Sequence, residues 1–78
     1  MEQKIKHDQD IDIGANIRTV RKIRKMGQTE LVRHLQLMGV DITRETLVKI
    51  ERGIQHVKAS QLRAIKDVLK TTYDELLK

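Results

Sequence analysis

Apolar residues recur at three- and four-residue intervals along most of the chain, which is the spacing of helices that bury one face. The pattern is clearest over 28–38 and 44–52, and it breaks between them at 39–41. Similar stripes run over 12–25 and 60–69, and a last short one closes the chain. No segment gives a strand signal. The sequence therefore predicts an all-α bundle of five helices joined by short loops.

Several helix ends can be read directly from residue types. Thr43 stands where its side-chain oxygen can cap the amides of a new helix, and Gly53 can take the left-handed conformation that ends it. Thr72 and Glu75 have the spacing of a capping box, in which each side chain bonds the other's amide. The helix expected from residue 60 has no good capping residue before it.

The totals limit what kind of protein this can be. A chain of 78 residues forms one domain with a small core and is too small for a typical enzyme with a deep pocket. Residues 1–10 carry mixed charge and few apolar side chains, so we expect a flexible tail, with the domain over 11–78. There is no cysteine, and no apolar run approaches a membrane span or a secretory signal. A cytoplasmic location is the resulting expectation.

The charge favours a nucleic-acid partner. Sixteen Lys and Arg against eleven Asp and Glu give a net charge of +5. Much of the excess falls in the first helix, at Arg18, Arg21, Lys22, Arg24 and Lys25. Tyr73 is the one aromatic residue, whereas binders of single strands usually need several aromatic faces. Duplex DNA is therefore preferred over single strands, and a membrane surface is disfavoured because the basic helix has no aromatic anchors.

A set of residues between Ile13 and Leu77 has the types and the spacing of a known domain pattern. They are Ile13-Gly14, Ile17, Arg21, Gln28, Leu31, Leu35, Thr43, Thr46-Leu47, Ile50-Glu51, Gly53, Leu62, Ile65, Leu69 and Asp74-Glu75-Leu76-Leu77. Together they resemble the Cro/repressor-type helix-turn-helix domains, known as the XRE family. The resemblance implies a compact, five-helix, lambda-repressor-like bundle whose second and third helices form the helix-turn-helix.

The third helix has the features of a major-groove reader. The major groove admits one helix and presents a distinct pattern of donors and acceptors for each base pair. With Thr43 as cap, Arg44 and Glu45 project from the first turn toward base edges, and Lys49 lies one turn further on. Arg44 suits guanine, whereas Glu45 can accept from cytosine or only favour the helix dipole. We expect these three residues to read bases.

The resemblance also implies which residues touch the DNA backbone. Arg21 and Glu51 match a salt bridge between the first and third helices of the family, and the bridge can also be purely structural. Phosphate contacts are expected from Gln28, Thr43, Thr46, Arg52, His56 and Lys58.

One departure from the family's commonest form lies between the two motif helices. The residues between Leu35 and the cap Thr43 outnumber those of the usual connection. We therefore expect the second helix to be about one turn longer, with Leu37, Val40 and Ile42 folded back onto the core.

These observations predict a sequence-specific DNA-binding transcriptional regulator, most simply a repressor, that acts as a homodimer. Tyr73, Leu76 and Leu77 are the dimer candidates, although all three can instead be core residues. An antitoxin-type autoregulator with a toxin partner, or a helical protein-interaction module that binds an acidic partner, are the alternatives. No catalytic arrangement, cofactor site or metal-ligand spacing emerges, so an enzyme is not expected.

Overall fold

The structure is a computed structural model that describes residues 4–5 and 11–78, so the N-terminal tail expected over 1–10 lies outside the described residues except for 4–5. The described part is mostly helical, and its five helices occur in the expected order. They are α1 (Ile13–Ile23), α2 (Gln28–Leu37), α3 (Arg44–Glu51), α4 (Ala59–Leu69) and α5 (Tyr73–Leu76). None of them is long and apolar enough to cross a bilayer.

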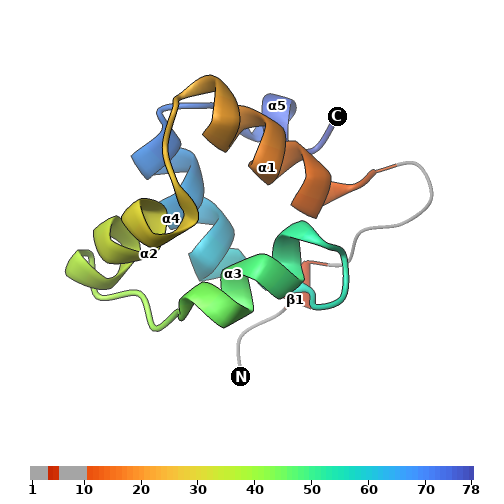
Figure 1. Cartoon of the computed structure of the whole chain (residues 1–78). Coiled ribbons are helices and arrows are strands. Elements are labelled where there is room, and N and C mark those ends of the chain that lie inside the picture. The colour runs from red at the N-terminus through yellow and green to blue at the C-terminus, as the bar shows by residue number, and fades with distance from the viewer. Residues whose placement is uncertain (1–3, 6–10) are drawn as a thin grey trace.

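The helices enclose one small core. α3 packs against α1 and α2, α2 packs against α4, and α1 packs against α5 (Figure 1). The largest fully buried side chains come from every helix and from the segment before α4: Ile17, Leu31, Leu35, Leu47, Ile50, Val57, Ile65, Leu69 and Leu76. These residues include the apolar stripes from which the helices were predicted.

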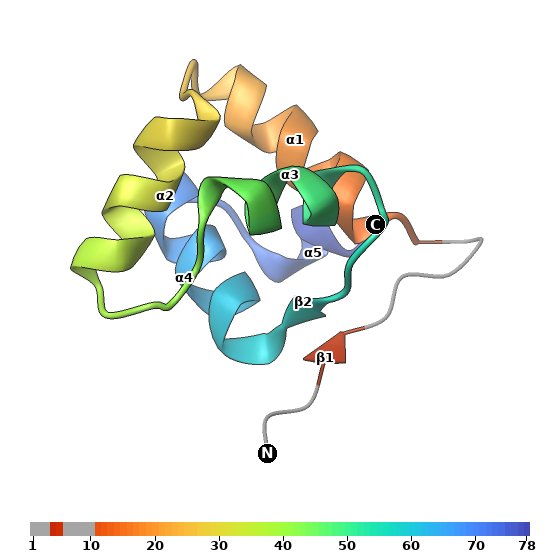
Figure 2. The same ribbon diagram turned by 60° about the horizontal axis from the view of Figure 1, so that its bottom comes forward.

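A short strand pair was missed by the sequence analysis. β1 (Lys4–Ile5) and β2 (Val57–Lys58) are antiparallel, with Lys4 opposite Lys58 (Figure 2). Two residues cannot show alternation, so no pattern could have indicated either strand. The pairing places the backbone of residues 4–5 beside the segment that leads from α3 into α4.

The connection between α2 and α3 agrees with the expectation only in part. α2 extends to Leu37, as predicted, and Gln36 Nε2 donates to the Ile42 carbonyl at 2.9 Å. Ile42 is 2% exposed and Val40 packs partly on the core, but Leu37 is 79% exposed. The expected burial of Leu37 is therefore wrong. It follows Leu35 by two residues, which is about 200° around a helix, so it lies on the opposite side from the core.

Two helix starts differ from the expected capping. Thr72 Oγ1 accepts from the Glu75 amide at 3.2 Å, but the Glu75 carboxylate bonds Lys78 Nζ at 3.2 Å instead of reaching back. α4, expected to be poorly capped, begins with a bond from the Lys58 amide to Gln61 Oε1 at 2.9 Å. Gln61 is 4% exposed, so this glutamine caps the helix from inside the bundle.

Gly14 fixes the distance between α1 and α3. A Cβ atom at this position would lie 1.9 Å from the Ile50 carbonyl oxygen and 2.9 Å from its carbon. Both neighbours are backbone atoms, so the clash could be relieved only by moving a helix. Glycine is therefore required here for packing, and the contact sets how deeply α3 sits against the bundle.

We expect Gly14→Ala to lower the free energy of unfolding by about 1–3 kcal/mol, because the added methyl group forces the two backbones apart. Chemical denaturation followed by circular dichroism measures the change. Gly27→Ala is the matched control, since a Cβ there meets nothing within 4 Å. Gly27→Ala should lower the free energy of unfolding by less than about 1 kcal/mol. An equal loss of stability in both variants would contradict the close-contact explanation.

Candidate nucleic-acid interface

α3 presents a charged outer face and a buried inner face. Leu47, Ile50 and Glu51 are buried against the bundle. The outer side chains Arg44, Glu45, Lys49 and Arg52 are all exposed. The structure therefore brings the three predicted base-reading residues together on one exposed surface, with Arg52 at the end of the same helix.

The start of α3 is fixed by Thr43, as expected. Its Oγ1 accepts from the Thr46 amide at 3.1 Å and donates to Thr46 Oγ1 at 3.0 Å. This double contact satisfies one of the unpaired amides of the first turn and orients both hydroxyl groups. The Thr46 hydroxyl can still donate to a phosphate, whereas the Thr43 hydrogen is already used within the chain.

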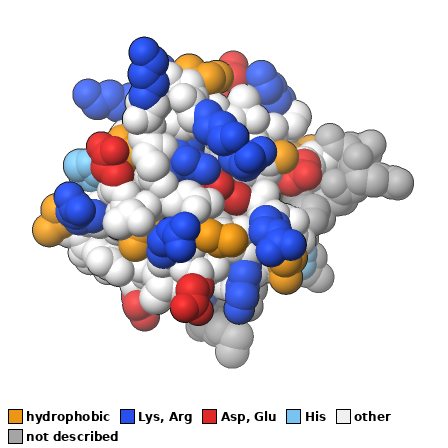
Figure 3. Space-filling view, viewed as in Figure 1, with side chains coloured by type: hydrophobic (Ala, Val, Ile, Leu, Met, Phe, Trp, Pro, Cys, Tyr) orange, Lys and Arg blue, Asp and Glu red, His pale blue; other side chains and the backbone are white. Residues whose placement is uncertain are grey.

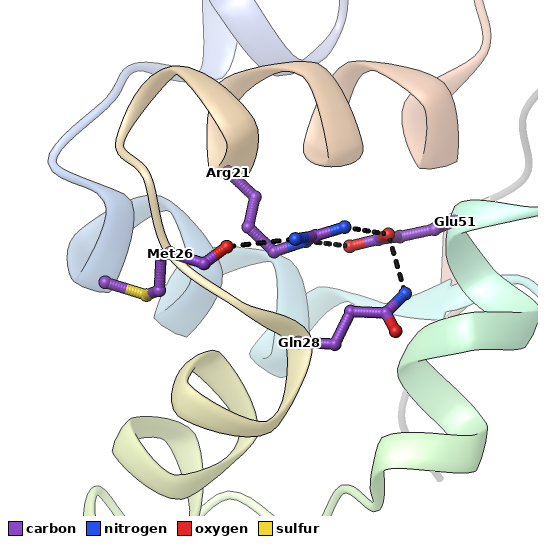
Figure 4. A network of polar contacts seen from close by, with 4 residues as sticks. All are labelled: Arg21, Met26, Gln28 and Glu51. Atoms are coloured by element: carbon purple, nitrogen blue, oxygen red, sulfur yellow. Dashed lines mark hydrogen bonds and ion pairs between the residues drawn. The ribbon is translucent and has the colours of Figure 1, made fainter.

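A buried ion pair joins α1 to α3. Arg21 Nε lies 2.8 Å from Glu51 Oε2 and Arg21 Nη2 lies 2.9 Å from Glu51 Oε1, so the contact is bidentate (Figure 4). Arg21 Nη1 also donates to the Met26 carbonyl at 2.9 Å. The two side chains are 9% and 2% exposed. The expected salt bridge is present, and its burial gives it a structural role.

Gln28 extends this network to the start of α2. Its Nε2 donates to Glu51 Oε1 at 3.1 Å, so Gln28 points toward the bridge between α1 and α3 (Figure 4). One amide hydrogen is used in this contact and one remains for an outside acceptor. Gln28, at the N-terminus of α2, therefore has one amide hydrogen left for the expected phosphate contact, and its bond to Glu51 holds the side chain in place.

The basic residues of α1 are not equivalent. Arg21 is buried, and Arg24 donates to the Leu69 carbonyl at 2.8 Å and to the Lys70 carbonyl at 3.0 Å. Arg24 therefore caps the end of α4, a role that the sequence analysis did not assign. Arg18, Lys22 and Lys25 are exposed. Figure 3 shows Lys and Arg side chains across the face formed by α1 and α3, with few acidic ones between them.

The segment after α3 differs in detail from the expectation. Both Lys58 and His56 were expected to contact the DNA backbone; Lys58 is exposed, whereas His56 is partly buried. Val57 is 2% exposed and fixes the segment on the core, while Ile54 is 63% exposed. Of the two predicted phosphate contacts in this segment, Lys58 is the more accessible.

The three dimer candidates separate clearly. Leu76 is 0% exposed and belongs to the core of the single chain, and Leu77 is partly buried against that core. Tyr73 is 42% exposed, with Lys66 Nζ 5.1 Å from the centre of its ring. Leu76 is therefore a core residue, and among the three Tyr73 offers the most surface to a partner.

The described residues show neither a metal site nor a pocket. These residues contain no group of three or more His, Asp or Glu side chains that could hold a metal ion, and they enclose no pocket. Comparisons of the chain with protein-family models, curated proteins and solved structures find no match. Function must therefore be inferred from the geometry around α1, α2 and α3 and from the motif residues themselves.

We expect Glu51→Gln to lower the free energy of unfolding by roughly 3–5 kcal/mol, because it leaves the Arg21 guanidinium buried without a counter-charge. Thermal and urea denaturation of the variant measure the loss.

The exposed pair between Lys66 Nζ and Asp67 Oδ1 provides the control, since its atoms are also 2.9 Å apart but its side chains are 25% and 49% exposed. Asp67→Asn should change stability by no more than about 0.5 kcal/mol. If Glu51→Gln were equally mild, the bridge would not support α3.

Proposed function

We propose that the chain is a sequence-specific, duplex-DNA-binding transcriptional regulator of the helix-turn-helix type, with a lambda-repressor-like arrangement of its helices. The observation that carries this proposal is α3 itself: a short, capped helix that buries only one stripe and presents Arg44, Glu45 and Lys49 outward. A helix of this size fits the major groove, and side chains of these types bond base edges there.

The supports behind α3 favour the same proposal. Base recognition needs donors held in a fixed position, because a helix that tilts cannot keep its hydrogen bonds to base edges. Gly14 sets the approach of α1 to α3, and the Arg21–Glu51 bridge fixes the end of α3 against α1.

The backbone of the DNA has matching partners around α3. The N-terminus of α2 offers unpaired amides together with the remaining amide hydrogen of Gln28. Thr46, Arg52 and Lys58 lie at the start of α3, at its end and beyond it. Such contacts position a protein on the duplex without reading its sequence.

A second copy of the chain is part of the proposal. One α3 reads only a few base pairs, so specificity and affinity require paired half-sites, which lie about 34–36 Å apart in dimeric readers. The domain measures 31 × 31 × 20 Å, so two copies side by side can place their α3 helices at about this separation.

A protein partner is the second candidate, and a specific observation favours it. Leu37 and Met38, at the end of α2, are 79% and 51% exposed. Contiguous exposed apolar surface is typical of protein contact sites, and these two residues are neighbours in the chain. They suit an interaction module, or an antitoxin that holds a toxin while it binds DNA. A steep loss of DNA affinity with rising salt would separate a DNA-binding chain from an interaction module that does not bind DNA.

Selection of binding sites from random duplexes at physiological salt should enrich a two-fold symmetric motif. Three exposed arginines then test the assignment. Arg44→Ala should relax specificity at one position, which corresponds to about 1–3 kcal/mol of discrimination. Arg52→Ala should weaken all sites alike and reduce the slope of log K against log salt by about one.

Arg63→Ala is the control, because it removes the same charge from an exposed position on α4 rather than α3. It should leave the selected motif and the salt slope nearly unchanged. If the three variants behave alike, the chain binds DNA only through its overall positive charge, and α3 does not read bases. A folded protein that enriches no motif would favour the interaction module.

We also expect sedimentation to detect two copies of the chain on a duplex that carries the whole symmetric motif and one copy on a single half-site. Tyr73→Ala should weaken the pairing on DNA, since Tyr73 is exposed on α5. A single copy on the full motif would exclude the homodimer while leaving the DNA-binding proposal in place.

A further inference from the structure

Val48 is an apolar residue on the charged outer side of α3. It is partly buried, yet among the described residues it belongs neither to the core cluster nor to the hydrophobic side chains packed against that cluster. Its neighbours one turn away along the helix are Arg44 and Arg52, both exposed. Figure 3 shows a small hydrophobic patch over α3, with Lys and Arg side chains on either side.

The residue type is informative at this place. Valine forms helices less readily than leucine or the long polar residues, and its stiff side chain has few rotamers. Valine offers no hydrogen bond, so its contribution to recognition would have to be apolar. The apolar group that a base pair presents in the major groove is the C5-methyl of thymine.

We propose that Val48 packs on the C5-methyl group of a thymine and so makes the chain prefer that base. This inference rests on the proposed DNA-reading function and adds a specificity-determining residue to Arg44, Glu45 and Lys49. Val48 follows Arg44 by four residues, an advance of about 6 Å along the helix, and bases follow each other by about 3.4 Å. The thymine therefore lies one or two base pairs from the guanine bound by Arg44.

The contact discriminates by a single methyl group. Cytosine has a hydrogen at C5 and places its amino group in the groove, so the valine would lose its apolar contact and face a polar one. Burial of one methyl group corresponds to about a three- to fivefold change in affinity. Neighbouring Arg44 and Arg52 do not supply this preference, because their guanidinium groups seek acceptors on guanine or on phosphate.

The test removes only the methyl group. Once the motif has been selected, the thymine nearest the Arg44 guanine is replaced by deoxyuridine in a synthetic duplex, and the dissociation constant is measured by fluorescence anisotropy. The natural chain should bind the uracil duplex about three- to fivefold more weakly. Val48→Ala should show a smaller difference between the two duplexes, because its shorter side chain buries less of the thymine methyl group, and circular dichroism verifies that it is folded.

Lys49→Ala is the matched control. It changes the next residue of the same helix, so it should weaken binding while keeping the difference between thymine and uracil. A duplex with cytosine at this position should bind more weakly than the thymine duplex. Replacing that cytosine by 5-methylcytosine should recover part of the lost affinity, because the methyl group returns.

The possible failures are distinct. A selected motif without thymine within two base pairs of the Arg44 guanine overturns the inference alone, as does equal binding of thymine and uracil by the natural chain. A uracil penalty that is undiminished in Val48→Ala also overturns it. Enrichment of no motif overturns the proposed function and this inference together.

Discussion

The contact on which the rest depends is the buried bridge between Arg21 and Glu51. Removing two charges from water has a large cost, which is recovered only when both groups are fully hydrogen-bonded. Here the bonds are bidentate, Arg21 also donates to the Met26 carbonyl, and Gln28 donates to the same carboxylate. One carboxylate thus ties together α1, the start of α2 and the end of α3. An apolar contact would stabilise the bundle too, but it would not fix orientation as tightly.

Orientation matters here because the bundle is small. A core built from one stripe on each helix resists separation of the helices more strongly than it resists their sliding or rotation. The contact of Gly14 with the Ile50 backbone restricts depth, and the bridge restricts rotation about the long axis of α3. These two constraints act at the same end of α3, while the Thr43 cap defines the other end. Together they leave α3 with a defined position and an outer face not used in folding.

Much of this could be predicted from sequence, and the failures have identifiable causes. Periodicity gave the helices because it reports local geometry, and Thr43 and Gly53 marked the ends of α3 because caps act within a few residues. The expected burial of Leu37 is wrong because a residue two positions after the buried Leu35 lies on the opposite side of α2, whatever its hydrophobicity. The role of Arg24 depends on carbonyl groups that become its neighbours only after folding. Gln61 is different, because it bonds the amide only three residues before it, and it was missed because the preceding residues lack the usual Ser, Thr or Asp cap. A basic residue on an amphipathic helix does not reveal whether it meets solvent, phosphate or a distant carbonyl.

The buried side of α3 holds the helix in the bundle, whereas its outer side contributes little to the fold and is free to vary in sequence. Leu47, Ile50 and Glu51 are buried and determine whether the helix is held. The outer residues, Val48 among them, contribute little to the core, so substitutions there should leave the fold intact. A proposed reader of this kind can therefore acquire a new target sequence while its stability stays nearly constant.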